Sequence, residues 1–107
     1  MQISQYDMVL VNLDPTVGSE IRKTRPCIVI SPDEINYNLN TIVIAPMTSK
    51  SRNYPTRVKV LHNKTEGFVV IDQIRTIDKR RIVKRFDTLH PAEIKIVKAI
   101  IKETFVD

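Results

Sequence analysis

Three polar segments interrupt the apolar stretches of this 107-residue chain, at residues 13–26, 46–57 and 72–76. They contain Arg25, Thr48 and Asp72 in that order, and each of these residue types can take part in chemistry. An arginine fork matches two phosphate oxygens and keeps its charge at any working pH. A threonine hydroxyl can donate to a further oxygen or orient a reacting hydroxyl. These residue types indicate phosphate chemistry, provided that the fold brings them together.

The first polar segment is longer than a connection between two strands requires. It holds Gly18, one of only two glycines in the chain, and it ends at Arg25-Pro26. Hairpin loops usually take about two to five residues. A loop of this length on a small domain favours a functional role.

The apolar patterns around these segments predict mostly β-structure. Strands are predicted at residues 8–13, 27–30, 41–45, 56–61, 68–76 and 82–88, with one helical turn at 33–38. Pro46 is expected to end the third strand, and Pro91 to begin a helix. The apolar stripe of that helix is Ile94, Val97, Ile100, Ile101 and Phe105. The predicted fold is therefore mainly β with a C-terminal helix, as a small antiparallel barrel or strongly twisted sheet.

The predicted strand directions say where the polar side chains would meet. In an antiparallel sheet, the start of the second strand and the ends of the third and fifth strands can share one rim. That rim would gather Arg25, Thr48, Asp72, Gln73 and Arg75.

Composition narrows the class of protein. The net charge of +5 and the pI of about 9.6 favour a polyanionic partner, either nucleic acid or an acidic protein, over a basic protein with no such partner. We expect one domain over residues 1–107, no signal peptide and no membrane span. The single Cys27 cannot form an internal disulfide, which favours the cytoplasm. Two isolated histidines and one cysteine predict neither a metal site nor a cofactor.

A series of short motifs adds a family resemblance. In order, they are Leu13-Asp14-Pro15-Thr16, Gly18-Ser19-Glu20, Thr24-Arg25-Pro26, Ala45-Pro46-Met47-Thr48-Ser49, Tyr54-Pro55-Thr56 and Asp72-Gln73-Ile74-Arg75-Thr76-Ile77-Asp78. Each motif alone is weak, but their order and spacing resemble the MazF/PemK toxins over essentially the whole chain. The resemblance implies an SH3-like barrel shared with the gyrase poison CcdB, and a homodimer. It also implies sequence-specific cleavage of single-stranded RNA and neutralisation by a small antitoxin.

The resemblance also assigns roles to residues. The catalytic arginine and threonine of the family fall on Arg25 and Thr48, and the aspartate used by some members falls on Asp72. This chain has Ser19 where some members have a histidine, and Val70 where some have an arginine, so mechanisms that need those groups do not transfer. The predicted RNA-binding residues are Gly18, Ser19, Glu20, Lys23, Ser49, Tyr54, Gln73 and Arg75.

The residue types agree with cleavage that needs no metal. RNA carries its own nucleophile, the 2′-hydroxyl, so the enzyme must stabilise phosphoryl charge and align the attack. The expected products are a 2′,3′-cyclic phosphate and a 5′-hydroxyl. Arginine is a poor base at a pKa above ~12, so the general base and acid stay unassigned.

Structural roles are the alternative for each of these residues. Arg25 would pair with Glu20, Thr48 would cap the turn after Pro46, and Asp72 would pair with Arg75 or Arg25. Tyr54 would pack on the barrel rim, and the basic residues at 79–85 would form a solvated face. At the level of function, the rivals are a non-enzymatic gyrase-binding toxin like CcdB and an inactive binding module.

Overall fold

The computed structural model describes residues 2–13, 24–50, 54–62 and 65–107 of the chain. The strands are β1 (Asp7–Asn12), β2 (Thr24–Val29), β3 (Thr41–Thr48), β4 (Arg57–His62), β5 (Thr65–Val70), β6 (Arg75–Asp78) and β7 (Ile82–Thr88). The helices are α1 (Asp33–Asn38), α2 (Pro91–Phe105) and the short 3₁₀ turns η1 (Ile71–Gln73) and η2 (Lys79–Arg81). The predicted class, mainly β with a C-terminal helix, is confirmed.

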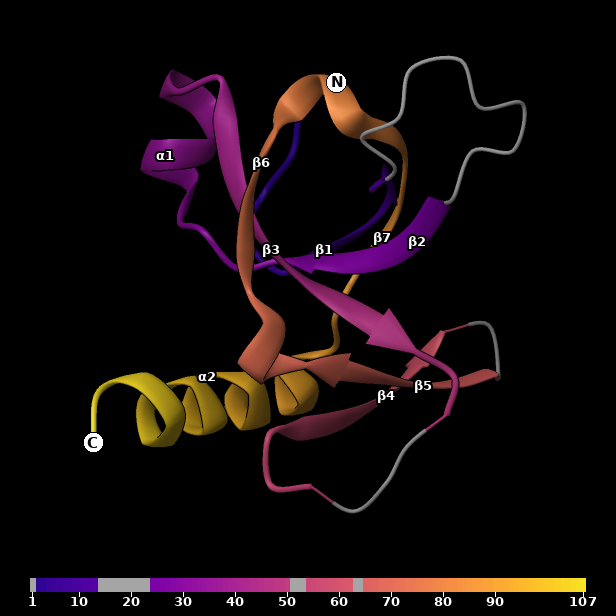
Figure 1. Cartoon of the computed structure of the whole chain (residues 1–107), viewed down its shortest axis with the longest axis vertical. Coiled ribbons are helices and arrows are strands. Elements are labelled where there is room, and N and C mark those ends of the chain that lie inside the picture. Colours follow the sequence, from indigo (N-terminus) through magenta and orange to yellow (C-terminus); the bar gives the residue numbers. More distant parts are fainter. Residues whose placement is uncertain (1, 14–23, 51–53, 63–64) are drawn as a thin grey trace.

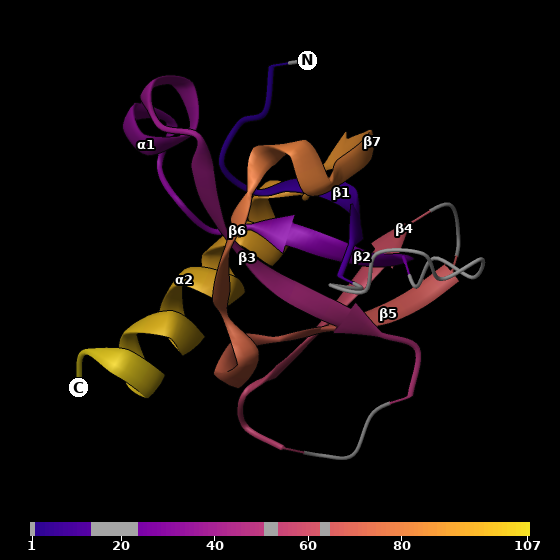
Figure 2. The ribbon, with the colours of Figure 1, turned by 45° about the horizontal axis from the view of Figure 1, so that its top comes forward.

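The strands form one curled antiparallel sheet in the order β4-β5-β3-β2-β1-β7, with β6 paired to β3 outside this path. Figure 1 shows β3 running diagonally between two groups of strands. On one side lie β1, β2 and β7, and on the other lies the β4–β5 hairpin, with α2 alongside. The same division is visible in the turned view of Figure 2. The sheet is the expected small curled barrel, with β4 and β7 as the two ends of its strand order.

The predicted fifth strand, 68–76, is two strands in the structure. β5 pairs with the end of β3, where Phe68 lies opposite Thr48, whereas β6 pairs with its beginning, where Arg75 lies opposite Ile44. The turn η1 separates them and lets one segment follow the curved edge of β3.

The prediction that Pro46 ends the third strand is wrong, because β3 continues to Thr48. On one side Pro46 faces Cys27 of β2. On the other side it falls between the β6 pairing, which stops at Ile44, and the β5 pairing, which starts at Met47. A residue without an N–H is tolerated at this gap between ladders.

Strand alternation divides the core between the two faces of the sheet. One cluster includes Met8, Ile28, Ala45, Met47, Val69 and Val97. The other includes Val9, Val11, Cys27, Val29, Ile42 and Ile44. The central strands β1, β2 and β3 therefore contribute side chains to both clusters, whereas the first three residues of β2 are exposed.

Helix α2 closes the first cluster with the predicted apolar stripe. Val97 is fully buried, and three further members of the stripe pack partly buried against the cluster, at positions 94, 100 and 101. Phe105 lies outside the core and is exposed. At its first turn Glu93 accepts from the backbone N–H of His90, at 3.0 Å, and from that of Leu61, at 2.8 Å, so it ties α2 to β4.

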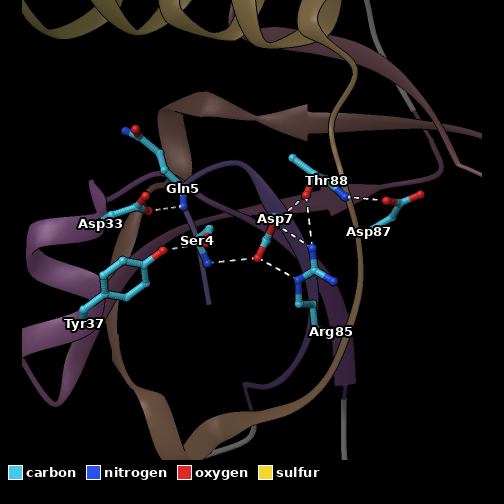
Figure 3. Close-up of polar contacts among 8 residues, drawn as sticks. All are labelled: Ser4, Gln5, Asp7, Asp33, Tyr37, Arg85, Asp87 and Thr88. Carbon is cyan, nitrogen blue, oxygen red and sulfur yellow. Dashed lines mark hydrogen bonds and ion pairs between the residues drawn. The ribbon is translucent and has the colours of Figure 1, made fainter. Parts of the chain in front are cut away.

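A buried polar network fastens β1 to β7 (Figure 3). The Asp7 carboxylate accepts from Arg85 Nε at 2.8 Å, from Thr88 Oγ1 at 2.7 Å and from the Ser4 backbone N–H at 2.9 Å. Just before it, Tyr6 has a φ of 68°, a left-handed value that is uncommon outside glycine. Its backbone bonds to both Val29 and Leu89, so the turn joins β2 to the end of β7.

No helix in the described part of the chain combines the length and the apolar character needed to cross a membrane.

Candidate active site

Arg25 and Thr48 lie on neighbouring strands. Arg25 is the second residue of β2, paired with Val11 of β1, and Thr48 is the last residue of β3. Cys27 faces Pro46, so continuing this antiparallel register by two residues brings Arg25 opposite Thr48. The sequence interpretation had put Arg25 in a loop. The structure instead places Arg25 on a strand. Its backbone and those of Thr24 and Pro26 are paired with β1.

A second cation, Arg75, acts electrostatically on the Cys27 thiol, as Arg25 does. Arg75 begins β6, on the other side of β3 from Arg25. The charges of Arg25 and Arg75 both act on the buried Cys27 thiol and oppose the effect of burial on it. Burial prevails and raises the pKa of Cys27 to about 12, so the thiol is protonated and is no nucleophile. Arg75 pairs with Ile44 of β3, four residues from Thr48, so it lies further along the sheet than Arg25 does.

Arg25 and Thr48 also border the same cavity, of about 570 Å³. Its lining residues are Met8, Thr24, Arg25, Pro26, Met47, Thr48, Ser49, His62, Glu66, Gly67 and Phe86. Phe86 is in ring contact with His62, with centroids 5.4 Å apart. Methionines, proline and phenylalanine give an apolar wall, while the hydroxyl, carboxylate and imidazole groups supply polar atoms. A cavity of this kind can hold a planar polar ligand.

Sequence analysis missed the part of this cavity that comes from β4, β5 and β7. His62 falls just outside the strand predicted at 56–61, and Glu66 and Phe86 were not singled out. Each lies in an ordinary strand context, so its sequence neighbours carry no signal. Only the approach of the β4–β5 hairpin to β7 brings these residues beside Arg25.

Within the described residues, the Thr48 hydroxyl makes a local hydrogen bond. Its oxygen accepts from the backbone N–H of Lys50 at 3.3 Å, which is the turn-capping bond of the structural alternative. Accepting this bond still leaves the hydroxyl proton to be donated. The capping role and a role toward phosphate are therefore compatible. Ser49, a predicted RNA-binding residue, is exposed at the same cavity.

The Asp72 carboxylate accepts its hydrogen bonds from residues that do not line the cavity. Its Oδ1 accepts from Thr56 Oγ1 at 2.8 Å and from Arg57 Nη1 at 2.6 Å. The hydrogen bond from Thr56 is the largest influence, and together with the nearby Arg57 charge it holds the pKa of this carboxyl below its ordinary value. The structural alternative expected Arg75 or Arg25 as the partner, but the structure gives Arg57. Gln73, the next residue, is exposed on η1.

Four predicted RNA-binding residues, Gly18, Ser19, Glu20 and Lys23, lie outside the described residues. The alternative pairing of Arg25 with Glu20 lies outside them as well.

Several cations of the basic run at 79–85 have structural partners. Arg80 pairs with Asp78 at 3.0 Å, and Arg85 with Asp7 at 2.8 Å. The ammonium of Lys84 lies 5.2 Å from the centre of the Phe86 ring. These contacts favour a structural surface over an RNA track. Within the described residues, no three histidine, cysteine, aspartate or glutamate side chains cluster as metal ligands.

Comparison with known proteins places this geometry in a family. The model of the "PemK-like, MazF-like toxin of type II toxin-antitoxin system" family matches residues 4–105. The chain belongs to this family. It is 33% identical to the endoribonuclease toxin MazF of Escherichia coli (strain K12) over 94 residues, which cover 87% of this chain and 85% of that protein.

Solved structures agree on the fold. MazF from Deinococcus radiodurans superposes with a TM-score of 0.80 at 24% identity and covers 96% of each chain. A MazE–MazF complex from the same organism gives a TM-score of 0.82 at 24% identity, covering 96% of this chain and 95% of that one. A mycobacterial endoribonuclease in complex with its cognate antitoxin gives 0.81 at 18% identity, covering 94% and 92%. The family predicted from the motifs is confirmed, and the matches favour MazF-like toxins over a gyrase poison.

Proposed function

We propose that this chain is a metal-independent endoribonuclease toxin that cuts single-stranded RNA at specific sequences and is neutralised by a cognate antitoxin. RNA cleavage follows from membership of a family whose E. coli relative is an endoribonuclease. The observation that carries the assignment of the site is the meeting of Arg25 and Thr48 on adjacent strands, at one cavity.

The chemistry needs a cation and a donor on the scissile phosphate. The 2′-hydroxyl gives up its proton as its oxygen attacks phosphorus, the bond from phosphorus to the 5′-oxygen breaks, and the departing 5′-oxygen takes up a proton, so the number of protons is unchanged. The products are a 2′,3′-cyclic phosphate and a 5′-hydroxyl. Arg25 binds two non-bridging oxygens as a fork while charge builds up on them, and Thr48 donates to an oxygen or aligns the attacking hydroxyl. Arg75, which lies opposite Ile44 of β3, adds positive charge to this part of the sheet.

Asp72, the third residue predicted to be catalytic, fits this scheme less well. It is bound by Thr56 and Arg57, and a carboxylate whose pKa is lowered is a weak proton acceptor at neutral pH. Asp72 is therefore a poor candidate for the general base.

The partners follow from charge and from the family. The antitoxin is proposed to be acidic and partly disordered, and to compete with RNA for the same basic groove of this chain, whose net charge is +5. The MazE–MazF complexes of D. radiodurans support an antitoxin partner. We propose that the toxin acts in the cytoplasm as a homodimer, with the RNA along the groove between its two subunits.

Replacing Arg25 tests the proposal directly. Arg25→Ala should lower the rate of RNA cleavage by about 10²–10³-fold, the usual cost of removing one well-placed transition-state donor. The matched control is Arg80→Ala, because Arg80 is exposed and pairs with Asp78 away from the cavity. Cleavage is followed on a long RNA, and the ends of the fragments are identified chemically. Equal rates for Arg25→Ala and wild type would refute the assignment.

An RNA with a 2′-deoxynucleotide at one cleavage site separates the rival functions. Hydrogen in place of the attacking 2′-hydroxyl should abolish cleavage at that one site only. Continued cleavage there would exclude the cyclic-phosphate route. If the wild-type protein leaves every RNA whole and instead inhibits gyrase, the CcdB-like alternative is correct.

A further inference from the structure

Tyr54, Arg57 and Asp72 form a connected unit on the rim. The guanidinium carbon of Arg57 lies 5.5 Å from the centre of the Tyr54 ring. The same guanidinium group donates to Asp72 Oδ1 at 2.6 Å, and Thr56 Oγ1 donates to that oxygen at 2.8 Å. Asp72 therefore holds Arg57, and Arg57 lies against the tyrosine ring.

The backbone holds the unit in place as well. The N–H of Arg57 donates to the carbonyl of Tyr54 at 3.0 Å, and the N–H of Ile71 donates to the carbonyl of Thr56 at 3.0 Å. The turn that carries Tyr54 is thus fixed to the start of β4 and to η1. A ring held in this way loses little conformational entropy when a ligand stacks on it.

Exposure within the unit is graded. The Arg57 side chain is only 18% exposed and the Asp72 side chain 43%, whereas Tyr54 is 50% exposed. The structural alternative, in which Tyr54 packs into the rim, does not account for an aromatic residue that stays half open to solvent. A cation on one face of an aromatic ring leaves the other face for a planar group.

The unit is close to the proposed cutting site. Phe68 of β5 faces Thr48, and two residues further along β5, Val70 faces Arg57. Arg57 is therefore two strand spacings across and two residues along from Thr48, or roughly 12 Å. A nucleotide beside the scissile phosphate of an extended RNA strand can bridge such a span.

We infer that Tyr54 is a stacking platform for one base flanking the cut, and that Asp72 is a positioning residue that holds the platform through Arg57. The inference rests on the proposed function and names one contact of its RNA substrate. Aromatic stacking is the usual way in which proteins hold unpaired bases. With this role, Asp72 contributes to substrate binding instead of proton transfer.

Binding to an RNA that cannot be cut tests the platform. The probe is a fluorescent single-stranded RNA with a 2′-deoxynucleotide at the cut site, and its dissociation constant is measured by anisotropy. Tyr54→Ala should weaken binding about 5- to 150-fold, which corresponds to the ~1–3 kcal/mol of one base stack. Tyr54→Phe should keep the wild-type affinity. Tyr37→Ala is the matched control, because Tyr37 is 47% exposed on α1, away from the site.

Removing the base itself identifies the contact. Single abasic nucleotides are placed at each position of the same RNA. One position near the cut should weaken wild-type binding but cause no further loss with Tyr54→Ala, because both changes remove the same stack. If Tyr54→Ala binds like wild type, or if its loss is the same at every abasic position, the platform is excluded.

Kinetics test the role of Asp72. Asp72→Asn should raise KM and weaken binding without adding to the effect of Tyr54→Ala, while kcat and the acidic limb of its pH profile stay at wild-type values. A kcat lowered by about 10²–10⁴-fold, with unchanged RNA binding, would make Asp72 the general base and overturn the inference.

The binding measurements on uncleavable RNA are independent of whether the protein cuts RNA. If wild type binds the probe through Tyr54 but no RNA is cleaved, the proposed enzymatic function fails while the platform stands. If RNA is cleaved in an Arg25-dependent way and Tyr54 makes no contribution to binding, only the platform fails.

Discussion

Two carboxylate–arginine pairs in this small barrel have nearly the same chemistry but opposite settings. The Asp7 side chain is 1% exposed and joins Arg85 between β1 and β7, whereas the Asp72 side chain is 43% exposed and joins Arg57 at the rim. Each carboxylate also accepts from a threonine hydroxyl, that of Thr88 in the first pair and that of Thr56 in the second. The first pair joins two strands of the sheet, and the second lies on the rim beside the exposed Tyr54 ring.

The difference shows how burial determines whether an ion pair mainly stabilises the fold or mainly positions a neighbouring group. A buried carboxylate must have its partners, and breaking such a set costs much more stability than breaking an exposed pair. The exposed pair adds little to stability, so its geometry is better explained by what it holds in place. We therefore interpret Asp7–Arg85 as a fastening of the fold and Asp72–Arg57 as part of the substrate surface.

Removing each carboxylate should separate these roles most clearly. Asp7→Ala should lower the free energy of unfolding by about 3 kcal/mol, because Arg85, Thr88 and the Ser4 N–H all lose their acceptor. Asp72→Ala should lower it by less than ~1 kcal/mol. Urea unfolding at one fixed protein concentration measures both, since association of subunits would otherwise shift the result. Equal losses of unfolding free energy in the two variants would contradict the different roles assigned to the two pairs.

Low pH should destabilise the fold by protonating Asp7 in the buried pair, which is the next largest expected effect. Burial alone would raise the pKa of Asp7, but the hydrogen bonds from Arg85, Ser4 and Thr88 outweigh it and leave this pKa below its ordinary value. The stabilisation is therefore complete above the unfolded-state pKa, near ~4, and is lost as the pH falls through the folded-state value. Urea midpoints taken between about pH 6 and pH 2 should fall for wild type and fall less for Asp7→Asn. Parallel curves for the two proteins would contradict this assignment.

Local patterns in the sequence predicted the parts of the fold that depend on neighbouring residues. Alternation predicted the strands, and the apolar stripe predicted α2, where Val97 is fully buried. Strand order then predicted the meeting of Arg25 and Thr48. The error at Pro46 arose because a proline usually ends a strand, whereas here it sits where β3 passes from one partner strand to another.

The pairs compared above could not be predicted in the same way. Asp7 and Arg85 are separated by 78 positions in the chain, and their contact depends on the closure of β7 against β1. Asp72 and Arg57 are separated by 15 positions, and they meet because Arg57 lies opposite Val70 in the β4–β5 register. A sequence motif can identify a functional residue, but the strand register of the folded chain determines which residue it contacts.

The smallest expected effect comes from the two threonines, and it separates the pairs with the least disturbance. Valine has nearly the shape of threonine, so each substitution removes little more than one hydroxyl donor to a carboxylate. Thr88→Val should cost about 1–2 kcal/mol of unfolding free energy, because the acceptor is buried, and should leave RNA binding unchanged. Thr56→Val should cost less than ~0.5 kcal/mol, because water replaces the lost donor, but it should weaken binding of uncleavable RNA severalfold by loosening Asp72 and Arg57. Urea unfolding and anisotropy on the same two variants measure both quantities. The opposite pattern, in which Thr56→Val unfolds more easily and Thr88→Val loses RNA, would reverse the assignment of the two pairs.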